Sequence, residues 1–254
     1  MSTSDPRFHQ ATEITTATYD QKAEDYAERN AERGPFWVER MERFIGLMEE
    51  ALEERPIADL STLGRPGDDI TLEEYLAFVP VLDAGCGPGR DARAMAALGL
   101  PVLAVDISQG MLDAAGERTP RRLPKGAIRY ALMDLRRLDL PDACARGVWC
   151  SASLLHLPHR TAPRAMAELA RVARAGAPVA VFLKLRKPDE EPERYEPYPG
   201  ENPDNLTRFF AYYSEDEAAA LLTGAGLELV ELLVRGKPVS PNDHAWICAL
   251  GRRP

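Results

Sequence analysis

The sequence predicts an α/β protein built on an open, doubly wound parallel sheet. Short apolar runs without polar alternation recur between helix-like segments, which is typical of strands covered on both faces. In addition, residues 81–92 run from an apolar strand through a turn with three glycines into a helix-prone stretch. That order of strand, glycine turn and helix opens a nucleotide-binding sheet.

Composition limits the classes of function. The 254 residues suffice for one α/β domain with a full core. A net charge of −9 disfavours nucleic-acid binding and favours a small-molecule substrate. The polar N-terminus and the lack of an apolar run of about 20 residues predict a cytoplasmic protein without a membrane partner. The cysteines lack metal-ligand spacing, so we expect free thiols and no metal at Cys86, Cys144, Cys150 and Cys248.

The N-terminal third is expected to be helical. Residues 10–30 predict a helix with Tyr19, Ala23, Tyr26 and Ala27 on one stripe, and residues 36–54 predict a second amphipathic helix ended by Pro56. Residues 61–69 are expected to form a loop, and Thr71-x-x-Glu74 is a capping box that starts a short helix through Phe78. We therefore divide one compact unit into a helical segment with an insert, 1–78, and an α/β segment, 79–254.

The α/β segment alternates regularly. Strands are expected at 81–84, 101–106, 127–132, 147–153, 179–185, 227–235 and 244–251. Helices are expected between them at 91–98, 111–118 and 162–175, and after a Ser214 cap at 215–225. Residues 187–205 are rich in Pro, Glu and Tyr and predict a long loop over the carboxyl edge of the sheet.

The glycine turn alone leaves the ligand open. Gly87-x-Gly89-x-x-Ala92 satisfies the dinucleotide pattern, so a nicotinamide-dependent oxidoreductase is one hypothesis. Asp83 argues against it, because a carboxylate before the glycines would repel a pyrophosphate but could accept from an ammonium group. Asp106 and Asp134 end the next two strands, at the edge where such sheets bind ligands. Each acid alone could be a helix cap, but three beside one glycine turn favour a shared ligand.

Asp83-Ala84-Gly85-Cys86-Gly87-Pro88-Gly89 resembles the first motif of the class I S-adenosylmethionine-dependent methyltransferases, an acid followed by G-x-G-x-G. The resemblance covers about residues 17–251 and is closest to the small-molecule type. It implies a Rossmann-like sheet of seven strands with the last antiparallel, and S-adenosylmethionine as cofactor, giving S-adenosylhomocysteine as product. It also implies lid helices at the N-terminus, where tyrosines close over the cofactor and the substrate mouth.

The resemblance implies cofactor roles for residues near the strand ends. Asp106 would take the ribose hydroxyls, Asp134 and the Leu135 N–H would read the adenine, and Arg90 would pair with the cofactor carboxylate. The remaining implied cofactor positions are Tyr19, Tyr26, Asp83, Gly85, Gly87, Ile107, Met111, Cys150 and Ser151.

The substrate side carries fewer signals. His156, after the fourth strand, is a candidate general base for a hydroxyl acceptor, although a histidine bonded to a neighbouring carbonyl explains it equally well. Tyr19, Phe209, Tyr212 and Tyr213 are candidate substrate residues, with core packing as the alternative for the last three. Cys150-Ser151-Ala152-Ser153 stands where amino-methylating DNA enzymes have Asp/Asn-Pro-Pro-Tyr. We therefore expect methyl transfer to an O, N or C atom of a small organic molecule, with a non-catalytic methyltransferase-like binding protein as a further alternative.

Overall fold

The computed structural model describes residues 6–32, 34–51, 71–124, 126–236 and 244–254. The expected loop at 61–69, the helix end at Pro56 and the insert around residues 55–70 lie outside these ranges. The division at residue 78 therefore stays a prediction. Among the described helices, none combines the length and the apolarity needed to cross a bilayer.

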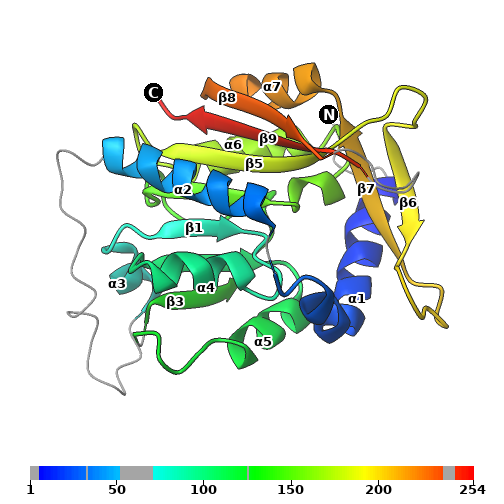
Figure 1. Ribbon diagram of the computed structural model, residues 1–254, viewed down its shortest axis with the longest axis horizontal. Coiled ribbons are helices and arrows are strands. Elements are labelled where there is room, and N and C mark those ends of the chain that lie inside the picture. The colour runs from blue at the N-terminus through cyan, green and yellow to red at the C-terminus, as the bar shows by residue number, and fades with distance from the viewer. Residues whose placement is uncertain (1–5, 33, 52–70, 125, 237–243) are drawn as a thin grey trace.

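A single mixed sheet organises the described chain (Figure 1). Five parallel strands lie in the order β3 (Ile128–Leu132), β2 (Val102–Asp106), β1 (Val81–Ala84), β4 (Gly147–Ser151) and β5 (Pro178–Leu185). On the far side of β5, β9 (Trp246–Arg252) pairs antiparallel and β8 (Glu228–Arg235) pairs antiparallel with β9. These seven strands, with the last one antiparallel, confirm the expected doubly wound fold.

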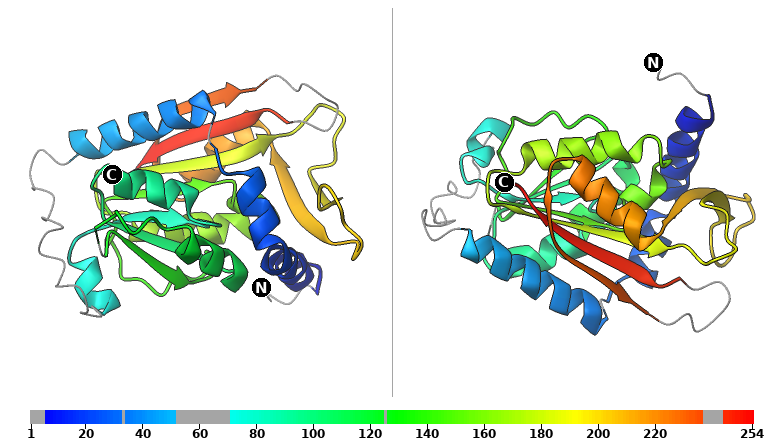
Figure 2. Two further views of the ribbon diagram at one scale, coloured as in Figure 1. Left: turned by 60° about the horizontal axis from the view of Figure 1, so that its bottom comes forward. Right: turned by 90° about the horizontal axis from the view of Figure 1, so that it is seen from above.

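Helices cover both faces of this sheet (Figure 2). Because successive strand residues point to opposite faces, Val81, Trp149 and Phe182 share one face, and Leu82, Val148 and Val181 share the other. The first face packs against α2 (Pro35–Glu50) and α4 (Arg90–Ala97), with α5 (Gln109–Glu117) at its margin. The second packs against α3 (Leu72–Leu76), α6 (Ala162–Val172) and α7 (Glu215–Gly224).

The apolar side of α2 lies where its sequence predicts, against the centre of the sheet. Phe44 and Met48 are almost completely buried and approach β4 at Gly147. A Cβ atom on Gly147 would lie 2.6 Å from the Met48 sulfur and 2.8 Å from Phe44. Gly147 therefore lets the helix pack directly on the strand, with the Phe44 ring edge-on to Trp149.

The capping box is confirmed. The Thr71 hydroxyl accepts from the Glu74 N–H at 3.2 Å, and the Glu74 carboxylate accepts from the Thr71 N–H at 2.6 Å. The helix that it starts, α3, ends at Leu76 rather than Phe78. Similarly, α6 ends at Val172 rather than at 175, because the chain turns toward β5 from Ala173 onward.

The N-terminal helix α1 (Pro6–Arg29) crosses the carboxyl ends of the parallel strands (Figure 1). It bends at Lys22, whose φ of −113° and ψ of 16° are not helical. Its predicted stripe packs on α5, where Ala23, Tyr19 and Tyr26 contact Met111 and Ala114. The helix therefore forms a roof over the edge where ligands of such sheets bind.

The prediction of a structureless segment at 187–205 is wrong for residues 193–197. These residues form β6 (Glu193–Pro197), which pairs antiparallel with β7 (Thr207–Tyr213), and β7 continues beside the end of β5. The usual alternation of apolar and polar residues in a strand is missing from the β6 sequence, because charged side chains occupy its inner face. Arg194 and Glu196 lie there, and they satisfy each other by an ion pair of 2.7 Å.

Candidate functional site

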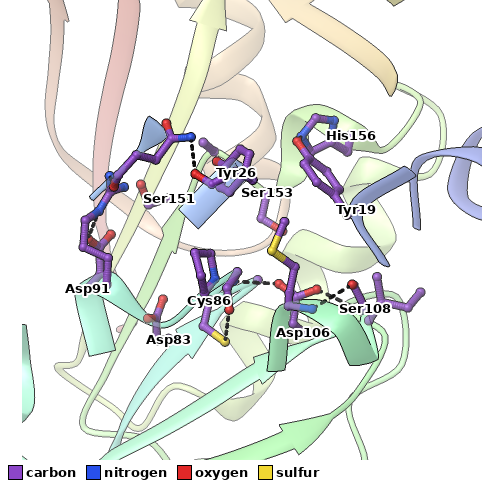
Figure 3. Close-up of a pocket in the computed structure, with 18 of the residues that line it drawn as sticks. Tyr19, Tyr26, Asp83, Cys86, Asp91, Asp106, Ser108, Ser151, Ser153 and His156 are labelled. Carbon is purple, nitrogen blue, oxygen red and sulfur yellow. Dashed lines mark hydrogen bonds and ion pairs between the residues drawn. The ribbon is translucent and has the colours of Figure 1, made fainter. Parts of the chain in front are cut away.

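A cavity of about 360 Å³ lies between the carboxyl ends of β1, β2 and β4 and the roof formed by α1 (Figure 3). Figure 3 shows Tyr19 and Tyr26 on one side of it, and Asp83, Cys86 and Asp106 on the other. It brings together most of the residues that the sequence singled out: Tyr19, Tyr26, Asp83, Gly85, Gly87, Arg90, Asp106, Ile107, Met111, Asp134, Leu135, Ser151 and His156.

The glycine turn packs closely against β2 and against the residues that follow β4. Gly85 and Cys86 both donate their N–H groups to the Val105 carbonyl, at 2.8 and 2.9 Å, which holds the turn against β2. Gly85 has a φ of +74°, and a Cβ atom there would lie 1.9 Å from the Ser153 hydroxyl oxygen. Only glycine fits this position, for conformational and steric reasons together.

The Asp106 carboxylate is fixed at the tip of β2 by the backbone. One oxygen accepts from the Gly87 N–H at 2.8 Å and the other accepts from the Ser108 N–H at 2.9 Å. Burial raises the pKa of Asp106, and these hydrogen bonds oppose that rise. Each carboxylate oxygen accepts more than one hydrogen bond, so the group can also accept from two neighbouring hydroxyls.

Two further carboxylates make this end of the cavity acidic. Asp83 ends β1 and is 1% exposed, and Asp91, in the first turn of α4, accepts from the Trp149 indole N–H at 2.8 Å. Burial, together with the charges of Asp106 and Asp83, raises the pKa of the Cys86 thiol, so Cys86 stays protonated. The two buried carboxylates and the partly exposed Asp106 around a backbone turn favour a ligand that carries positive charge.

Sequence reasoning missed Asp91, because an acid in the first turn of a helix is the ordinary partner of the helix dipole. The available signal was a tryptophan in the fourth strand, since its buried N–H needs an acceptor. Arg90 lines the cavity as expected. Its guanidinium donates to the backbone carbonyls of Asn30 and Glu32 and so links the end of α1 to the glycine turn.

At the rim of the cavity, Asp134 is held by Arg136. The Arg136 N–H donates to Asp134 at 2.8 Å, and its guanidinium forms an ion pair of 2.6 Å with the same carboxylate. The next residue, Leu135, contributes to the lining together with Ile107 and Met111. This side of the cavity therefore offers a carboxylate edge beside apolar surface.

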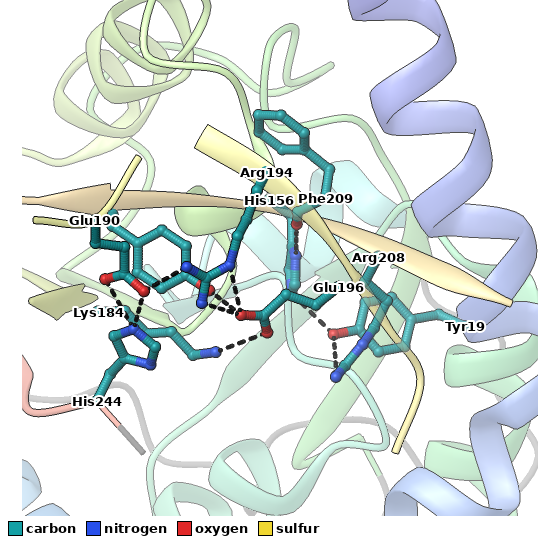
Figure 4. A network of polar contacts seen from close by, with 10 residues as sticks. Tyr19, His156, Lys184, Glu190, Arg194, Glu196, Arg208, Phe209 and His244 are labelled. Carbon is teal, nitrogen blue, oxygen red and sulfur yellow. Dashed lines mark hydrogen bonds and ion pairs between the residues drawn. The ribbon is translucent and has the colours of Figure 1, made fainter. Parts of the chain in front are cut away.

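At the opposite end, His156 joins the roof to the sheet. Its Nδ1 lies 2.7 Å from the Phe209 carbonyl and its Nε2 lies 2.8 Å from the Tyr19 hydroxyl (Figure 4). The carbonyl can only accept, so Nδ1 carries the hydrogen, and we assign the Tyr19 O–H as the donor to Nε2. Burial, with a smaller effect of Arg208 and Lys184, lowers the pKa of His156 to about 3, and burial raises the pKa of Tyr19. Both side chains are therefore neutral at pH 7.

Four predicted site residues do not line the cavity. Cys150 is fully buried in the core, and Phe209 reaches the site only through its carbonyl. The Tyr212 hydroxyl donates to Glu196, and the Tyr213 ring stacks on His159 with centroids 4.4 Å apart. The packing alternative fits this placement of the three aromatic residues.

The cavity also uses α1 residues that the sequence analysis passed over. Thr12, Thr15 and Thr16 line it, at helical spacing with Tyr19. The Thr15 hydroxyl accepts from the Phe209 N–H at 3.0 Å, and the Thr18 hydroxyl donates to the Thr207 carbonyl at 2.7 Å. The helical spacing of the threonines was the available signal. It could not be interpreted from sequence, because their hydrogen-bond partners lie on β7, far away in the chain.

The strand order, the antiparallel last strand, the glycine turn and the acids at the strand tips together define the fold of the class I methyltransferases. Residues 81–176 match a family described as methyltransferase domain. This segment holds the glycine turn, Asp106, Asp134 and His156. The four cysteines are free thiols, as expected.

Individual relatives agree with this class. The chain is 40% identical over 105 residues to malonyl-[acyl-carrier protein] O-methyltransferase of Serratia marcescens, which is 41% of this chain and 38% of that protein. It is 33% identical over 119 residues, 46% of this chain and 40% of the other, to an S-adenosyl-L-methionine-dependent Diels-Alderase of Talaromyces variabilis. The chain thus spans about two fifths of the length of these curated relatives.

One solved structure shares the fold over the whole chain. It is the 1,6-didemethyltoxoflavin-N1-methyltransferase of Burkholderia thailandensis, crystallised with 1,6-didemethyltoxoflavin and S-adenosylhomocysteine. The TM-score is 0.61 at 18% identity, covering 100% of this chain and 93% of the other. At this identity the likeness concerns the fold alone.

Proposed function

We propose that the protein is an S-adenosylmethionine-dependent methyltransferase that methylates an O, N or C atom of a small organic molecule. The observation that carries the proposal is the acidic end of the cavity, where Asp83, Asp91 and Asp106 surround the glycine turn. A sulfonium and an ammonium group both suit such surroundings, and a Cβ on Gly87 would have no neighbour nearer than 4.0 Å, so the cavity beside that backbone is open. The residues therefore fit the cofactor.

Individual residues have separate tasks in this proposal. Asp106 accepts from the two ribose hydroxyls, and Asp134 with the Leu135 N–H reads the adenine. Ile107 and Met111 pack against that ring. Asp83 and the backbone near Ser151 hold the methionine part, with Arg90 toward its carboxylate. When bound, the cofactor supplies a methyl group made electrophilic by the sulfonium.

The protein contributes orientation and shielding. Tyr19 and Tyr26 on α1 cover the cavity, so a bound acceptor is held in line with the methyl group and away from water. Orientation of this kind can supply roughly 7–11 kcal/mol of a reaction barrier. For an acceptor that keeps its proton at neutral pH, the His156 Nε2 can act as general base once the Tyr19 hydroxyl turns away from its lone pair. Its low pKa makes it a weak base, but it is neutral at pH 7 and able to accept.

A nicotinamide-dependent oxidoreductase is less favoured, because Asp83 and Asp91 would lie close to the pyrophosphate of a dinucleotide. The acidic net charge supports a small molecule rather than a nucleic acid as partner. We also propose a cytoplasmic location, where the four cysteines would remain free thiols.

The proposal is tested with methyl-labelled S-adenosylmethionine and a panel of phenols, alcohols, amines and carboxylates. We expect label in one acceptor class and stoichiometric release of S-adenosylhomocysteine. Cofactor binding without transfer of label to any acceptor would favour a binding protein, or a cofactor-dependent enzyme of another type such as the Talaromyces relative.

A further inference from the structure

A positive charge lies directly behind the substrate end of the cavity. Arg208 on β7 places its guanidinium 5.0 Å from the ring centres of both Tyr198 and Phe210. One of its nitrogens donates to the Tyr19 hydroxyl at 3.4 Å (Figure 4). Aromatic faces attract such a cation without neutralising it.

Two neighbouring cations, Arg194 and Lys184, differ from Arg208 in having carboxylate partners. Arg194 pairs with Glu190 and, at 2.7 Å, with Glu196, and Lys184 lies 3.6 Å from Glu196. Within the described residues, no carboxylate lies within ion-pair distance of Arg208, and its buried Nε has no hydrogen-bond partner. Within this group of five described side chains, three cations face two carboxylates, so one positive charge is in excess.

This excess charge acts on the cavity through Tyr19. Arg208 donates to the Tyr19 oxygen, so the Tyr19 hydrogen is directed elsewhere, and among the residues that the structure describes its acceptor is His156. A donor that is itself hydrogen-bonded by a cation becomes a stronger donor. An anionic oxygen in the cavity would compete well with the neutral imidazole for that hydrogen, because charge-assisted hydrogen bonds are about twice as strong as neutral ones.

We propose, building on the proposed function, that the methyl acceptor is an anionic oxygen, as in a carboxylate or an acidic phenolate. It accepts from the Tyr19 hydroxyl, with the charge of Arg208 behind. In the transfer, the acceptor O⁻ forms a bond to the methyl carbon, and the S–CH₃ bond breaks with its electron pair remaining on sulfur. The anion and the sulfonium become a neutral ester or ether and a neutral thioether. No proton is released, so this acceptor needs no base.

The positive charge of Arg208 also disfavours protonated amines as methyl acceptors. An ammonium acceptor would have to enter between Arg208 and the sulfonium, where both neighbours are positive. Amines are therefore expected to be poor acceptors unless they are already neutral.

The test measures binding to the full-length protein saturated with S-adenosylhomocysteine. A panel of aliphatic and aromatic carboxylates is titrated, each beside its own amide, and nitrophenolates are titrated beside the matching nitroanilines. The anions are expected to bind at least about tenfold more tightly than their neutral partners, the ratio for one charge-assisted hydrogen bond. The two arms show whether carboxylates or phenolates are the preferred source of the charge.

Three variants complete the test. Arg208→Met should weaken anion binding by about tenfold or more, and Arg208→Lys should retain most of it. Arg43→Met removes an exposed charge on α2 and should change nothing. An unchanged affinity for S-adenosylhomocysteine shows that Arg208→Met is folded.

Neutral or amine partners that bind as tightly as the anions would overturn the inference, as would anion binding that Arg208→Met leaves intact or no binding by any panel member. In these cases S-adenosylhomocysteine still binds and the proposed function stands. If the parent protein does not bind S-adenosylhomocysteine, the proposed function fails instead.

Discussion

At the tip of β2, the backbone N–H groups of Gly87 and Ser108 hold the Asp106 carboxylate in place. This arrangement follows from two local sequence features, an acid at the end of an apolar strand and a glycine turn on the neighbouring strand. Asp83, Asp106 and Asp134 could therefore be placed at one edge from sequence alone. His156 was found by its position after the fourth strand, but its partner could not be, because Phe209 lies on a strand that the sequence did not reveal.

At the residue scale, His156 and Tyr19 make different predictions for different acceptors. His156→Ala should slow methyl transfer to an alcohol by about 10²-fold, the low end of the usual contribution of a general base, because the pKa of His156 lies well below neutral. It should leave transfer to a carboxylate within a few-fold of the parent. Steady-state rates with a matched alcohol and acid measure the difference.

Tyr19→Phe is the companion variant. It should weaken binding of the carboxylate acceptor and slow its methylation, because it removes the hydroxyl donor. Equal losses with both acceptors in His156→Ala would show that the histidine is only structural. If His156→Ala methylates the alcohol at the full parent rate at every pH, His156 is not a general base.

At the scale of elements, α1 is fastened to two neighbours. Asp20 accepts from the Ser108 hydroxyl at 2.5 Å and from the Gly110 N–H at 3.0 Å, which joins α1 to the start of α5. A Cβ on Gly110 would lie 2.7 Å from the Asp20 carbonyl oxygen, so the two backbones are in close contact. On the other side, Thr15 and Thr18 bond the backbone of β7.

Asp20→Ala should loosen this roof without touching the cofactor directly. We expect S-adenosylhomocysteine to dissociate about tenfold faster, since two hydrogen bonds that hold the closed arrangement are lost. Stopped-flow displacement measures the rate. Asp113→Ala is the control, because Asp113 is an exposed carboxylate that accepts from Gln109 on its own helix. An unchanged dissociation rate in Asp20→Ala would mean that α1 does not restrain the ligand.

The elements divide clearly into those that sequence could predict and those it could not. Four of the five parallel strands, β1, β2, β4 and β5, were recognisable because they are largely buried and apolar, whereas β3 is a half-buried edge strand. The strand β6 was not, because its inner face carries Arg194 and Glu196, and these are acceptable only beside Lys184 and Tyr212. β6 forms by pairing with β7, a contact between distant parts of the sequence that no local pattern predicts.

At the scale of the whole molecule, buried titratable groups tie stability to pH. His156 is neutral when folded, with a pKa of about 3, whereas the unfolded chain takes up a proton near its ordinary value of 6.5. For Glu196, burial raises the pKa, but Tyr212, Lys184 and Arg194 outweigh it and bring it to about 2. In both cases the unfolded chain binds more protons in acid, so stability falls as pH falls.

The two groups act in different windows. His156 should cost stability from about pH 6.5 down to 3, and Glu196 from about 4.5 down to 2. Urea unfolding measured between neutral pH and pH 4 should therefore show a slope that His156→Gln reduces above pH 5, where Glu196→Gln has little effect on it. If His156→Gln unfolds with the same pH dependence as the parent, the histidine is not held neutral.

The central claim is that carboxylates at the strand tips hold a nucleoside joined to an amino acid, and calorimetric titration with S-adenosylhomocysteine tests it most directly. The parent should bind S-adenosylhomocysteine stoichiometrically and should not bind a nicotinamide dinucleotide comparably, and Asp106→Asn should bind S-adenosylhomocysteine at least about tenfold more weakly. The exposed variant Asp113→Asn should bind as the parent does. Equal affinity of Asp106→Asn and the parent would contradict the account.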